Sequence, residues 1–492
     1  MHSRGPQIFV DILRRHVEAR GENPAVTFLG DDGNEETWSY NELDARARAM
    51  AASLLDLTEP GHRALLLCPQ GLDFVVAILA CFYSGVVAVP AYPPANARHW
   101  PRLERILADS RADVVVSTSA TKARTDAWLE GIARDGKPPG QLLVEDVDPA
   151  GAERFVGSEL SPDGHAFLQY TSGSTTSPKG VVVTHANLLA NLVMIRDSFG
   201  LTSRSDTVSW LPVFHDMGLI ASLLEQLFLG ARVVLMAAPT FIRRPSSWLE
   251  AITRFRPDWV GAPNFGYARC VDGVSVEQRR AFDLSSVRVA YCGSEPIDYR
   301  VADAFAAAFG ANGFNKRAFH PCYGMAEVTL FAAGSEPGSG GRRIHLDGTA
   351  LELGEARRVA PETPGARVLF SCGRPAPGAT LRIVDPDSCL PVAEGRVGEI
   401  WLAGPHVALG YWRNEEQTRE SFGVRLADGS DDRDYLRTGD LGFVDAGEVC
   451  VTGRIKDLLI IRGLNHYPQD IERTVAAAHP SLQPAEIGRA HV

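Results

Sequence analysis

The chain has 492 residues, of which 45% are hydrophobic and 22% are charged, and its formal net charge at pH 7 is −11. That length is enough for two or three domains with a large apolar core. An acidic chain of ordinary composition is not expected to have nucleic acid or an anionic membrane as its main partner. No apolar run reaches the roughly 20 residues that span a bilayer, so we predict a protein that does not cross a membrane.

Cysteine usage and the first residues both favour a cytoplasmic location. The eight cysteines are scattered and include no C-x-x-C pair, which suits neither a zinc site nor a disulfide framework. Residues 8–17 place apolar side chains among charged ones, a pattern typical of a short amphipathic helix. A signal peptide would need an unbroken apolar core. We therefore predict reduced thiols in a cytoplasmic protein.

Strand patterns alternate with helical patterns through the first two thirds of the chain. Helical stretches are expected at 72–84, 219–229 and 300–309. The candidate strands are 64–67, 114–117, 208–211, 233–235, 259–262 and 289–292. Alternation of this kind predicts an α/β fold, with mainly parallel sheets covered by helices. Near-continuous apolar strands suit sheets that are buried on both faces.

A polar loop between two apolar strands, 167–170 and 181–183, carries the strongest functional signal. The loop includes Lys179, one of only five lysines in the chain. The other candidate phosphate-binding residues are Thr171, Ser172, Gly173, Ser174, Thr175 and Thr176. Glycine lets backbone N–H groups turn toward an anion, hydroxyl groups add donors, and a lysine brings positive charge to phosphate oxygens. A flexible Ser/Thr linker is the alternative, but it would rarely hold a lone lysine between two strands.

The composition and the hydrophobic periodicity of the sequence change after about residue 330. Residues 332–363 are rich in Gly, Glu and Arg and have little periodicity, so we expect a surface insertion or a long loop. Residues 366–411 show short strands and turns, which predict a β-rich subdomain. A new unit is expected from residue 454 onward, but 454–492 is too short for an independent core.

The polar loop closely resembles the phosphate loop of the adenylate-forming superfamily, which includes acyl-CoA synthetases, luciferases and peptide-synthetase adenylation domains. The resemblance implies ATP as co-substrate and Mg²⁺ on its phosphates. It also implies a large AMP-binding N-terminal domain over 1–453 and a small α+β C-terminal domain that starts at 454. The likeness extends over nearly the whole chain, because further motifs follow in the order that the superfamily has.

Three further motifs resemble nucleotide-binding segments of that superfamily. In Tyr-Gly-Met-Ala-Glu, the resemblance makes Tyr323 stack on adenine, with Gly324 and Met325 beside it, and makes Glu327 hold the Mg²⁺. Mg²⁺ commonly takes one or two carboxylates plus phosphate oxygens. The adenine-pocket segment would be Gly293, Ser294, Glu295 and Pro296. By the same resemblance, Asp440 binds the two ribose hydroxyls, Arg454 contacts ribose and phosphate, and Lys456 is the hinge.

The segment that begins at His215 indicates which acid is activated. It reads His-Asp-Met-Gly, which resembles fatty acyl-AMP ligases, whereas amino-acid-activating domains carry Phe-Asp. The resemblance puts His215 near the acyl carboxylate and phosphate; the alternative for the residue type alone is a core histidine. Asn-His-Tyr-Pro at 465–468 also resembles these ligases. In them, an insertion at the place of 332–363 is thought to block coenzyme A.

The predicted function is therefore ATP-dependent activation of a long-chain fatty acid to a fatty acyl-adenylate. The acyl group would pass to the phosphopantetheine of an acyl carrier protein, commonly on a polyketide or peptide synthase. Catalysis is assigned to Lys179, His215 and Glu327. The alternatives are a long-chain fatty acyl-CoA ligase and a non-catalytic remnant that binds acyl groups or nucleotides.

The end of the chain departs from the superfamily pattern. These enzymes carry a C-terminal lysine that contacts the substrate carboxylate and the α-phosphate, but no lysine follows Lys456. Residues 487–492 match one reading frame of a widely used sequencing adapter. We expect a truncated C-terminal domain, and a chain that as written binds ATP but adenylates poorly.

Overall fold

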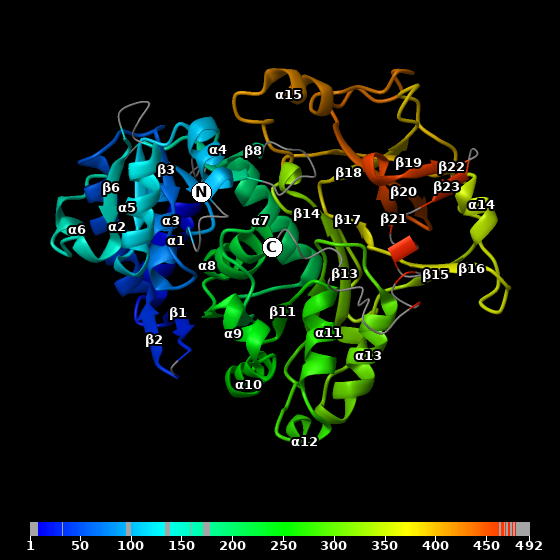
Figure 1. The fold of residues 1–492 in the computed structure, drawn as a ribbon, viewed down its shortest axis with the longest axis horizontal. Helices are drawn as coiled ribbons and strands as arrows, with labels where there is room; N and C mark the ends of the chain where they lie inside the picture. Colours follow the sequence, from blue (N-terminus) through cyan, green and yellow to red (C-terminus); the bar gives the residue numbers. More distant parts are fainter. Residues whose placement is uncertain are drawn as a thin grey trace, which may run out of the picture. The chain divides into compact units, whose positions relative to one another are not determined.

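The computed structural model describes residues 8–31, 33–94, 100–132, 138–157, 159–170, 178–461 and 464–466, together with 468, 471, 472, 475 and 478 (Figure 1). The chain divides into two compact units. Unit 1 comprises residues 1–260, 326–330 and 408–418, and unit 2 comprises residues 261–325, 331–407 and 419–492. The domain boundary expected at residue 453 stays a prediction.

The first sheet of unit 1 has the strand order β6-β5-β3-β4-β7-β8. All its neighbouring strands are parallel except β7 and β8, which form an antiparallel pair. The strands are β3 (Arg63–Leu66), β4 (Val87–Pro90), β5 (Val114–Ser117), β6 (Gly140–Leu143), β7 (His165–Tyr170) and β8 (Gly180–Thr184). The candidate strand β5 is buried along its whole length, as is β4. For β5 this confirms the inference drawn from its unbroken apolar sequence.

A second group of strands in unit 1 has β10 parallel to both β9 and β1, β2 antiparallel to β1, and β11 parallel to β9. These strands are β1 (Pro24–Leu29), β2 (Glu35–Ser39), β9 (Thr207–Ser209), β10 (Val233–Met236) and β11 (Trp259–Gly261). The candidate strands in these regions are therefore confirmed, with ends that differ by a residue or two.

Helices cover the sheets of unit 1 (Figure 1). They are α1 (Phe9–Arg20), α2 (Tyr40–Leu55), α3 (Leu72–Ser84), α4 (Trp100–Ser110), α5 (Ser119–Ile132), α6 (Gly151–Arg154), α7 (His185–Phe199), α8 (Glu225–Leu229), α9 (Ala238–Arg243) and α10 (Ser246–Phe255). Local sequence sets several helix starts, since Ser39 with Glu42 and Thr184 with Asn187 each form a capping box. The stretch expected as one helix at 219–229 is instead a π-helix, Met217–Leu224, followed by α8.

Unit 2 contains parallel strands β12 and β13, with β14 antiparallel to β13 and β17 antiparallel to β14. Helices α11 and α13 lie side by side (Figure 1). These elements are α11 (Asn264–Gly273), α12 (Val276–Arg279), β12 (Val289–Cys292), α13 (Tyr299–Phe309), β13 (Phe319–Gly324), β14 (Phe331–Gly334) and β17 (Arg374–Pro375).

The later part of unit 2 is rich in β-structure, as the sequence predicts. It has an antiparallel sheet in the order β18-β19-β20-β21 and two antiparallel strand pairs, β15 with β16 and β22 with β23. Its strands are β15 (Arg343–Asp347), β16 (Ala366–Phe370), β18 (Thr380–Val384), β19 (Gly398–Ala403), β20 (Leu436–Asp445), β21 (Glu448–Arg454), β22 (Leu459–Ile461) and β23 (Leu464–His466). The helices are α14 (Gly348–Glu352) and α15 (Glu415–Ser421), the latter crossing the sequence boundary between the units.

The stretch 332–363, for which a surface insertion or a long loop is expected, contains β15 and α14. Ile344, Leu346 and Leu351 from it are buried against Phe443 and Cys450. Arg342 pairs with Asp445 and Glu448 at 2.6 and 2.8 Å, and Arg358 also pairs with Asp445. Elements of five residues are too short to show a clear hydrophobic period, which is why the sequence pattern predicts a loop there.

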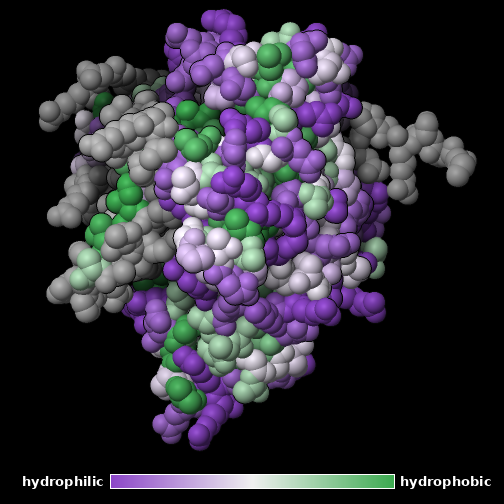
Figure 2. Space-filling model, turned by 90° about the vertical axis from the view of Figure 1, so that its right-hand side faces the viewer, coloured by the Kyte–Doolittle hydropathy of each residue, from purple (hydrophilic) through white to green (hydrophobic). Residues whose placement is uncertain are grey.

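The face shown in Figure 2 is mostly hydrophilic, with hydrophobic residues in small groups.

Candidate nucleotide and acyl site

The β7–β8 hairpin carries the polar loop. Tyr170 at the end of β7 pairs with Gly180 at the start of β8. A Cβ atom on Gly180 would lie 2.9 Å from the Tyr170 ring, and the Tyr170 hydroxyl is held by Asp109 at 2.5 Å, so the ring cannot easily move aside. Residues Thr171, Ser172, Gly173, Ser174, Thr175 and Thr176 lie outside the described residues, and their phosphate-binding role stays a prediction.

Lys179 and Glu327 contact the same tyrosine, which defines what we call the lysine–tyrosine–glutamate group. The Lys179 Nζ lies 4.9 Å from the centre of the Tyr411 ring. The Tyr411 hydroxyl donates a hydrogen bond to Glu327 Oε1 at 2.8 Å. Two charged residues that the sequence singled out separately are thus brought together in unit 1, by a residue that it did not single out.

The backbone of residues 408–412 explains why Tyr411 lies there. Leu409 N–H donates to Val182 O and Trp412 N–H donates to Gly180 O, so the segment runs along β8. Ala408 N–H donates to Glu327 O at 2.9 Å. Gly410 has φ +138°, and a Cβ there would lie 2.4 Å from a Thr418 methyl group, so the position admits only glycine.

His215 lies on a tight turn that precedes the π-helix. Its N–H donates to Pro212 O, and a Cβ on Gly218 would lie 2.2 Å from that same carbonyl oxygen. The His215 side chain is 52% exposed, whereas the side chain of Asp216 is 13% exposed. The role of His215 toward an acyl carboxylate stays a prediction. Gln169, just before the polar loop, donates to Phe214 O at 3.1 Å and so ties the two loops together.

The charges of His215 and Asp216 support one another. His215 Nδ1 lies 2.8 Å from Asp216 Oδ1, which also accepts from Met217 N–H at 2.7 Å. The surrounding protein disfavours the charged imidazole, but the Asp216 carboxylate favours it more, so the pKa of His215 lies above its ordinary value. Burial acts to raise the pKa of Asp216, but His215 and the Met217 N–H outweigh it and the net pKa is lowered. The pair therefore stays ionised over a wider pH range than either residue alone.

A second set of predicted residues meets in unit 2, and we call it the aspartate group. The Tyr323 hydroxyl donates to Asp440 Oδ2 at 2.8 Å, and Arg454 Nε donates to Asp440 Oδ1 at 2.9 Å. Asp440 and Arg454 face each other across β20 and β21. Burial raises the pKa of Asp440, and the lowering effects of Arg454 and Tyr323 do not fully cancel it.

The predicted adenine-pocket segment leaves the end of β12 next to β13, which carries Tyr323. The segment Gly293–Pro296 is held by α11, since Asn264 donates to Pro296 O at 2.8 Å and Phe265 N–H donates to Glu295 Oε1 at 3.2 Å. Ser294 has φ +70°, a conformation that costs energy for a residue other than glycine. Such strain is frequent at ligand sites.

The remaining predicted residues occupy less informative positions. Gly324 ends β13 and pairs with Phe331, and Met325 follows it half-buried. Lys456 lies exposed in a short turn, Ile455–Asp457. Residues 465 and 466 of the Asn-His-Tyr-Pro motif belong to β23, but residue 467 lies outside the described residues.

The donor set at Glu327 fits Mg²⁺ bound mainly by phosphate. Among the described residues, no cluster of three or more His, Cys, Asp or Glu side chains forms a metal cage. Glu327 supplies one carboxylate, whose Oε1 accepts a hydrogen bond from Tyr411. Mg²⁺ needs little more from a protein when the other ligands are phosphate oxygens and water.

Comparison with known proteins finds a matching family and relatives of similar sequence. Residues 13–412 match the family described as AMP-binding enzyme. The chain is 39% identical to the medium-chain-fatty-acid–[acyl-carrier-protein] ligase JamA of Moorena producens (strain JHB), over 96% of this chain and 81% of the relative. It is 37% identical to the long-chain-fatty-acid–AMP ligase FadD26 of Mycobacterium marinum (strain ATCC BAA-535 / M), over 94% and 81%.

It belongs to the AMP-binding enzymes. Within this adenylate-forming family it is closely related to the fatty acyl-AMP ligases. A solved fatty acid AMP ligase from Legionella pneumophila matches with a TM-score of 0.86 at 38% identity, over 96% of this chain and 81% of that one. The fold of this AMP-binding enzyme is therefore the expected α/β fold, a large domain with two mixed, mainly parallel sheets plus small β subdomains.

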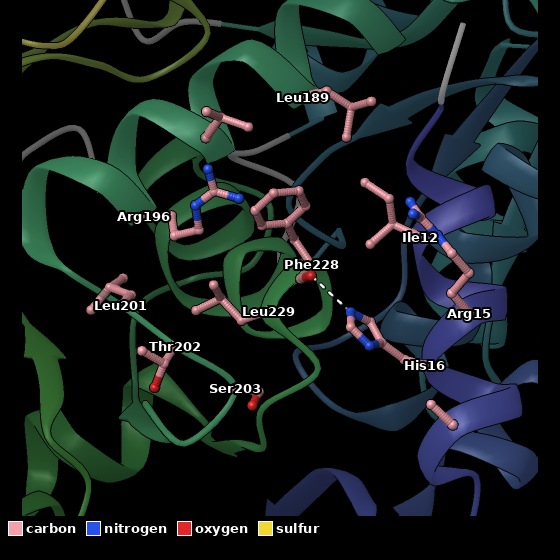
Figure 3. A pocket seen from close by; sticks show the side chains of 12 residues that line it. Ile12, Arg15, His16, Leu189, Arg196, Leu201, Thr202, Ser203, Phe228 and Leu229 are labelled. Atoms are coloured by element: carbon pink, nitrogen blue, oxygen red, sulfur yellow. Dashed lines mark hydrogen bonds between the residues drawn. The ribbon is translucent and has the colours of Figure 1, made fainter. Parts of the chain in front are cut away.

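One surface pocket of this AMP-binding enzyme contains none of the predicted site residues. It measures about 590 Å³ and lies among α1, α7 and α8 in unit 1. Figure 3 shows Arg15 and Arg196 on opposite sides of it, with Phe228 and Leu229 between them. His16 Nε2 lies 2.9 Å from Phe228 O. Because this nitrogen lies at hydrogen-bond distance from a main-chain carbonyl, we infer that His16 takes part in the packing of α1 on α8.

Sequence reasoning missed Tyr411 and Asn264. Both act through contacts with residues that are distant in sequence, Glu327 and Pro296. The available signal at Tyr411 was an aromatic pair, Tyr-Trp, directly after a glycine in a turn-rich stretch. Nothing in that stretch indicates which strand it will join, so the partners appear only in the fold.

Proposed function

We propose that this enzyme activates a fatty acid with ATP to give a fatty acyl-adenylate and pyrophosphate, and then transfers the acyl group to the phosphopantetheine thiol of an acyl carrier protein. In the transfer, the thiol sulfur bonds to the acyl carbon, the bond from that carbon to the phosphate oxygen breaks, and AMP and the thiol proton are released. The observation that carries the proposal is the lysine–tyrosine–glutamate group, because it brings an ammonium group and a carboxylate into contact with one side chain at the base of the polar loop. The names of the relatives supply the acid and the acceptor: an acyl-carrier-protein ligase and a fatty-acid–AMP ligase.

In the proposed first step, a carboxylate oxygen of the fatty acid attacks the α-phosphorus of ATP. A bond forms between that oxygen and phosphorus, and the bond from phosphorus to the bridging oxygen of pyrophosphate breaks. Lys179 would place positive charge against the departing pyrophosphate. Bound Mg²⁺ supplies further charge neutralisation, and Glu327 is the residue that would hold it.

His215 would orient the attacking carboxylate. Asp216 favours the charged form of its imidazole and so raises the pKa of His215 despite the opposing effect of burial, and the ring can donate a hydrogen bond to a carboxylate or phosphate oxygen. Asp440 would accept from the two ribose hydroxyls, since a carboxylate has about four acceptor sites and only two are taken by Tyr323 and Arg454. Positioning of this kind is most of what an in-line displacement requires.

The test has two steps. Purified enzyme is assayed for exchange of labelled pyrophosphate into ATP with medium- and long-chain fatty acids, and with amino acids as the control substrates. Exchange that depends on fatty acid supports the proposal, and exchange that depends on amino acids overturns it. The expectation of a long-chain acid stays a prediction, because the relatives include medium-chain and long-chain enzymes.

The second step offers the acyl-adenylate two thiols, a phosphopantetheinylated acyl carrier protein and coenzyme A. Acyl carrier protein is expected to be loaded in preference to coenzyme A. Robust acyl-CoA formation would identify the enzyme as a fatty acyl-CoA ligase. One relative that is 34% identical to this chain is named as a fatty-acid–CoA ligase.

A further inference from the structure

We propose that Tyr411 is a positioning residue that orients the Glu327 carboxylate for Mg²⁺ and the Lys179 ammonium for phosphate. The proposal rests on the proposed function, because it assigns roles toward magnesium ATP. Its starting point is that one side chain contacts both charged groups through two different parts. The hydroxyl donates to Glu327 Oε1 at 2.8 Å, and the face of the ring lies 4.9 Å from Lys179 Nζ.

The hydroxyl contact affects where the Glu327 carboxylate points. A hydrogen bond to a charged acceptor is stronger than one between neutral groups, and it favours the ionised carboxylate. It fixes the position of Oε1, and with it the direction in which the carboxylate of Glu327 faces. Without the hydroxyl, Glu327 would sample more rotamers, and each Mg²⁺ binding event would have to order it again.

The ring contact affects Lys179 in a different way. An aromatic face attracts an ammonium group without neutralising its charge, which a carboxylate partner would do. Lysine is a flexible point charge, so the ring limits the positions that the ammonium group samples. The two ends of Tyr411 therefore have separable consequences, one for the metal and one for the nucleotide.

Tyr411 can do this because its own backbone is fixed on both sides. Its N–H donates to Thr418 Oγ1 at 2.9 Å, and it forms a bridge with Val181 of β8. The neighbouring Ala408 N–H donates to the carbonyl of Glu327 itself. The same short segment is thus bonded to β8, which begins directly after Lys179, and to the main chain of Glu327, so the tyrosine is attached next to both residues that it orients.

Two variants separate the two contacts. Tyr411→Phe removes the hydroxyl and keeps the ring, and Tyr411→Leu removes both. The matched control is Tyr83→Phe, which removes a buried tyrosine hydroxyl that also donates to a carboxylate, that of Asp44, within unit 1. Binding of ATP is measured by calorimetry over a range of Mg²⁺ concentrations, alongside fatty-acid-dependent pyrophosphate exchange and the thermal unfolding midpoint.

For Tyr411→Phe we expect the Mg²⁺ concentration that gives half-maximal ATP binding to rise about 10-fold, with less than about a 2-fold change in ATP affinity at saturating Mg²⁺. Tyr411→Leu should weaken ATP binding at saturating Mg²⁺ as well, by about 5-fold. Tyr83→Phe should leave the Mg²⁺ dependence unchanged. A purely structural role for Tyr411 predicts equal loss at all Mg²⁺ concentrations together with a lower unfolding midpoint, and that result would overturn the proposal.

The binding measurement separates this proposal from the proposed function. If the wild-type enzyme binds magnesium ATP but shows no exchange with any fatty acid, the proposed function fails while the role of Tyr411 is still read from the Mg²⁺ dependence. If exchange with fatty acid is robust and the Mg²⁺ dependence of Tyr411→Phe equals that of wild type, the role of Tyr411 is wrong and the function stands.

Discussion

The lysine–tyrosine–glutamate group and the aspartate group hold their charges in opposite ways. In the first, Lys179 and Glu327 contact an aromatic side chain that carries no charge of its own. In the second, Asp440 is buried, with a side chain 6% exposed, and is paired directly with Arg454. A charge next to an aromatic ring keeps its strength toward a ligand, whereas a buried charge pair is already partly satisfied. The comparison suggests that the first group acts on developing charge and the second on neutral hydroxyl groups.

The sharpest test of this contrast is Lys179→Met, which removes the cation and keeps most of the side-chain volume. Fatty-acid-dependent pyrophosphate exchange should fall by about 100-fold or more, because a fixed charge next to a leaving group contributes strongly to transition-state stabilisation. The control is Lys122→Met on α5, an exposed lysine paired with Asp126, which should leave exchange unchanged. A fall of less than 5-fold for Lys179→Met would remove the catalytic role of the first group.

Asp440→Asn tests the second group. It should weaken ATP binding by about 10-fold, measured by calorimetry, because an amide accepts fewer hydrogen bonds than a carboxylate. The free energy of unfolding near neutral pH should not fall, since the raised pKa of Asp440 shows that burial disfavours its charged form. Because the folded protein favours the protonated form of Asp440, this group stabilises the fold at low pH, and that stabilisation is lost as the pH rises through the raised pKa.

The control for this variant is Asp434→Asn, which alters an exposed aspartate paired with Arg425 in the same unit. If Asp440→Asn unfolds more easily than wild type at neutral pH while ATP binding is unchanged, Asp440 is a structural ion pair and the contrast between the two groups disappears.

His215 should show a smaller and pH-dependent effect. His215→Gln keeps a hydrogen-bond donor and loses the charge, so exchange should fall by about 5-fold at a pH where the imidazole is protonated. Because Asp216 helps to raise the pKa of His215, wild-type activity that uses the charged form is present below that raised pKa and is lost as the pH rises through it. Asp216→Asn should move this loss to lower pH.

The matched control is His62→Gln, since His62 also lies near an aspartate, Asp113, at 3.6 Å and is similarly exposed. It should leave the pH profile of exchange unchanged. An unaltered profile in Asp216→Asn would mean that the charge on His215 plays no part in the reaction.

The smallest effect is expected at Arg358, which lies in neither group. Arg358→Ala breaks one pair with Asp445, but Arg342 keeps its own contact with that carboxylate. Arg358 is largely exposed, so unfolding in urea should lose only about 0.5 kcal/mol, and less at high salt. A loss above about 2 kcal/mol would show that this cluster, and not the apolar contacts of Leu346, holds residues 332–363 in place.

The sequence was sufficient for elements with an unbroken apolar run or a clear helical period, such as α3 and β5. It was insufficient where length or contacts decided the structure. Strand β15 is too short for a period to show, and the π-helix has the same apolar composition as an α-helix. Individual charged residues such as Glu327 and Asp440 were found through motif resemblance. Of their partners, Arg454 belongs to a motif that the resemblance also identified. Tyr411 belongs to no such motif, and its position depends on pairing with a strand that is distant in sequence.

The π-helix at Met217–Leu224 has a consequence for how the chain can vary. An α-helix turns by about 100° and advances by 1.5 Å for each residue, and a π-helix accommodates one extra residue per turn. Removing a single residue from this stretch would force one of two changes: a wide turn tightens to an α-helical one, or the turn that carries His215 rotates by about that angle relative to α8. The number of residues between His215 and α8 is therefore constrained, and this stretch should tolerate substitution far better than insertion or deletion.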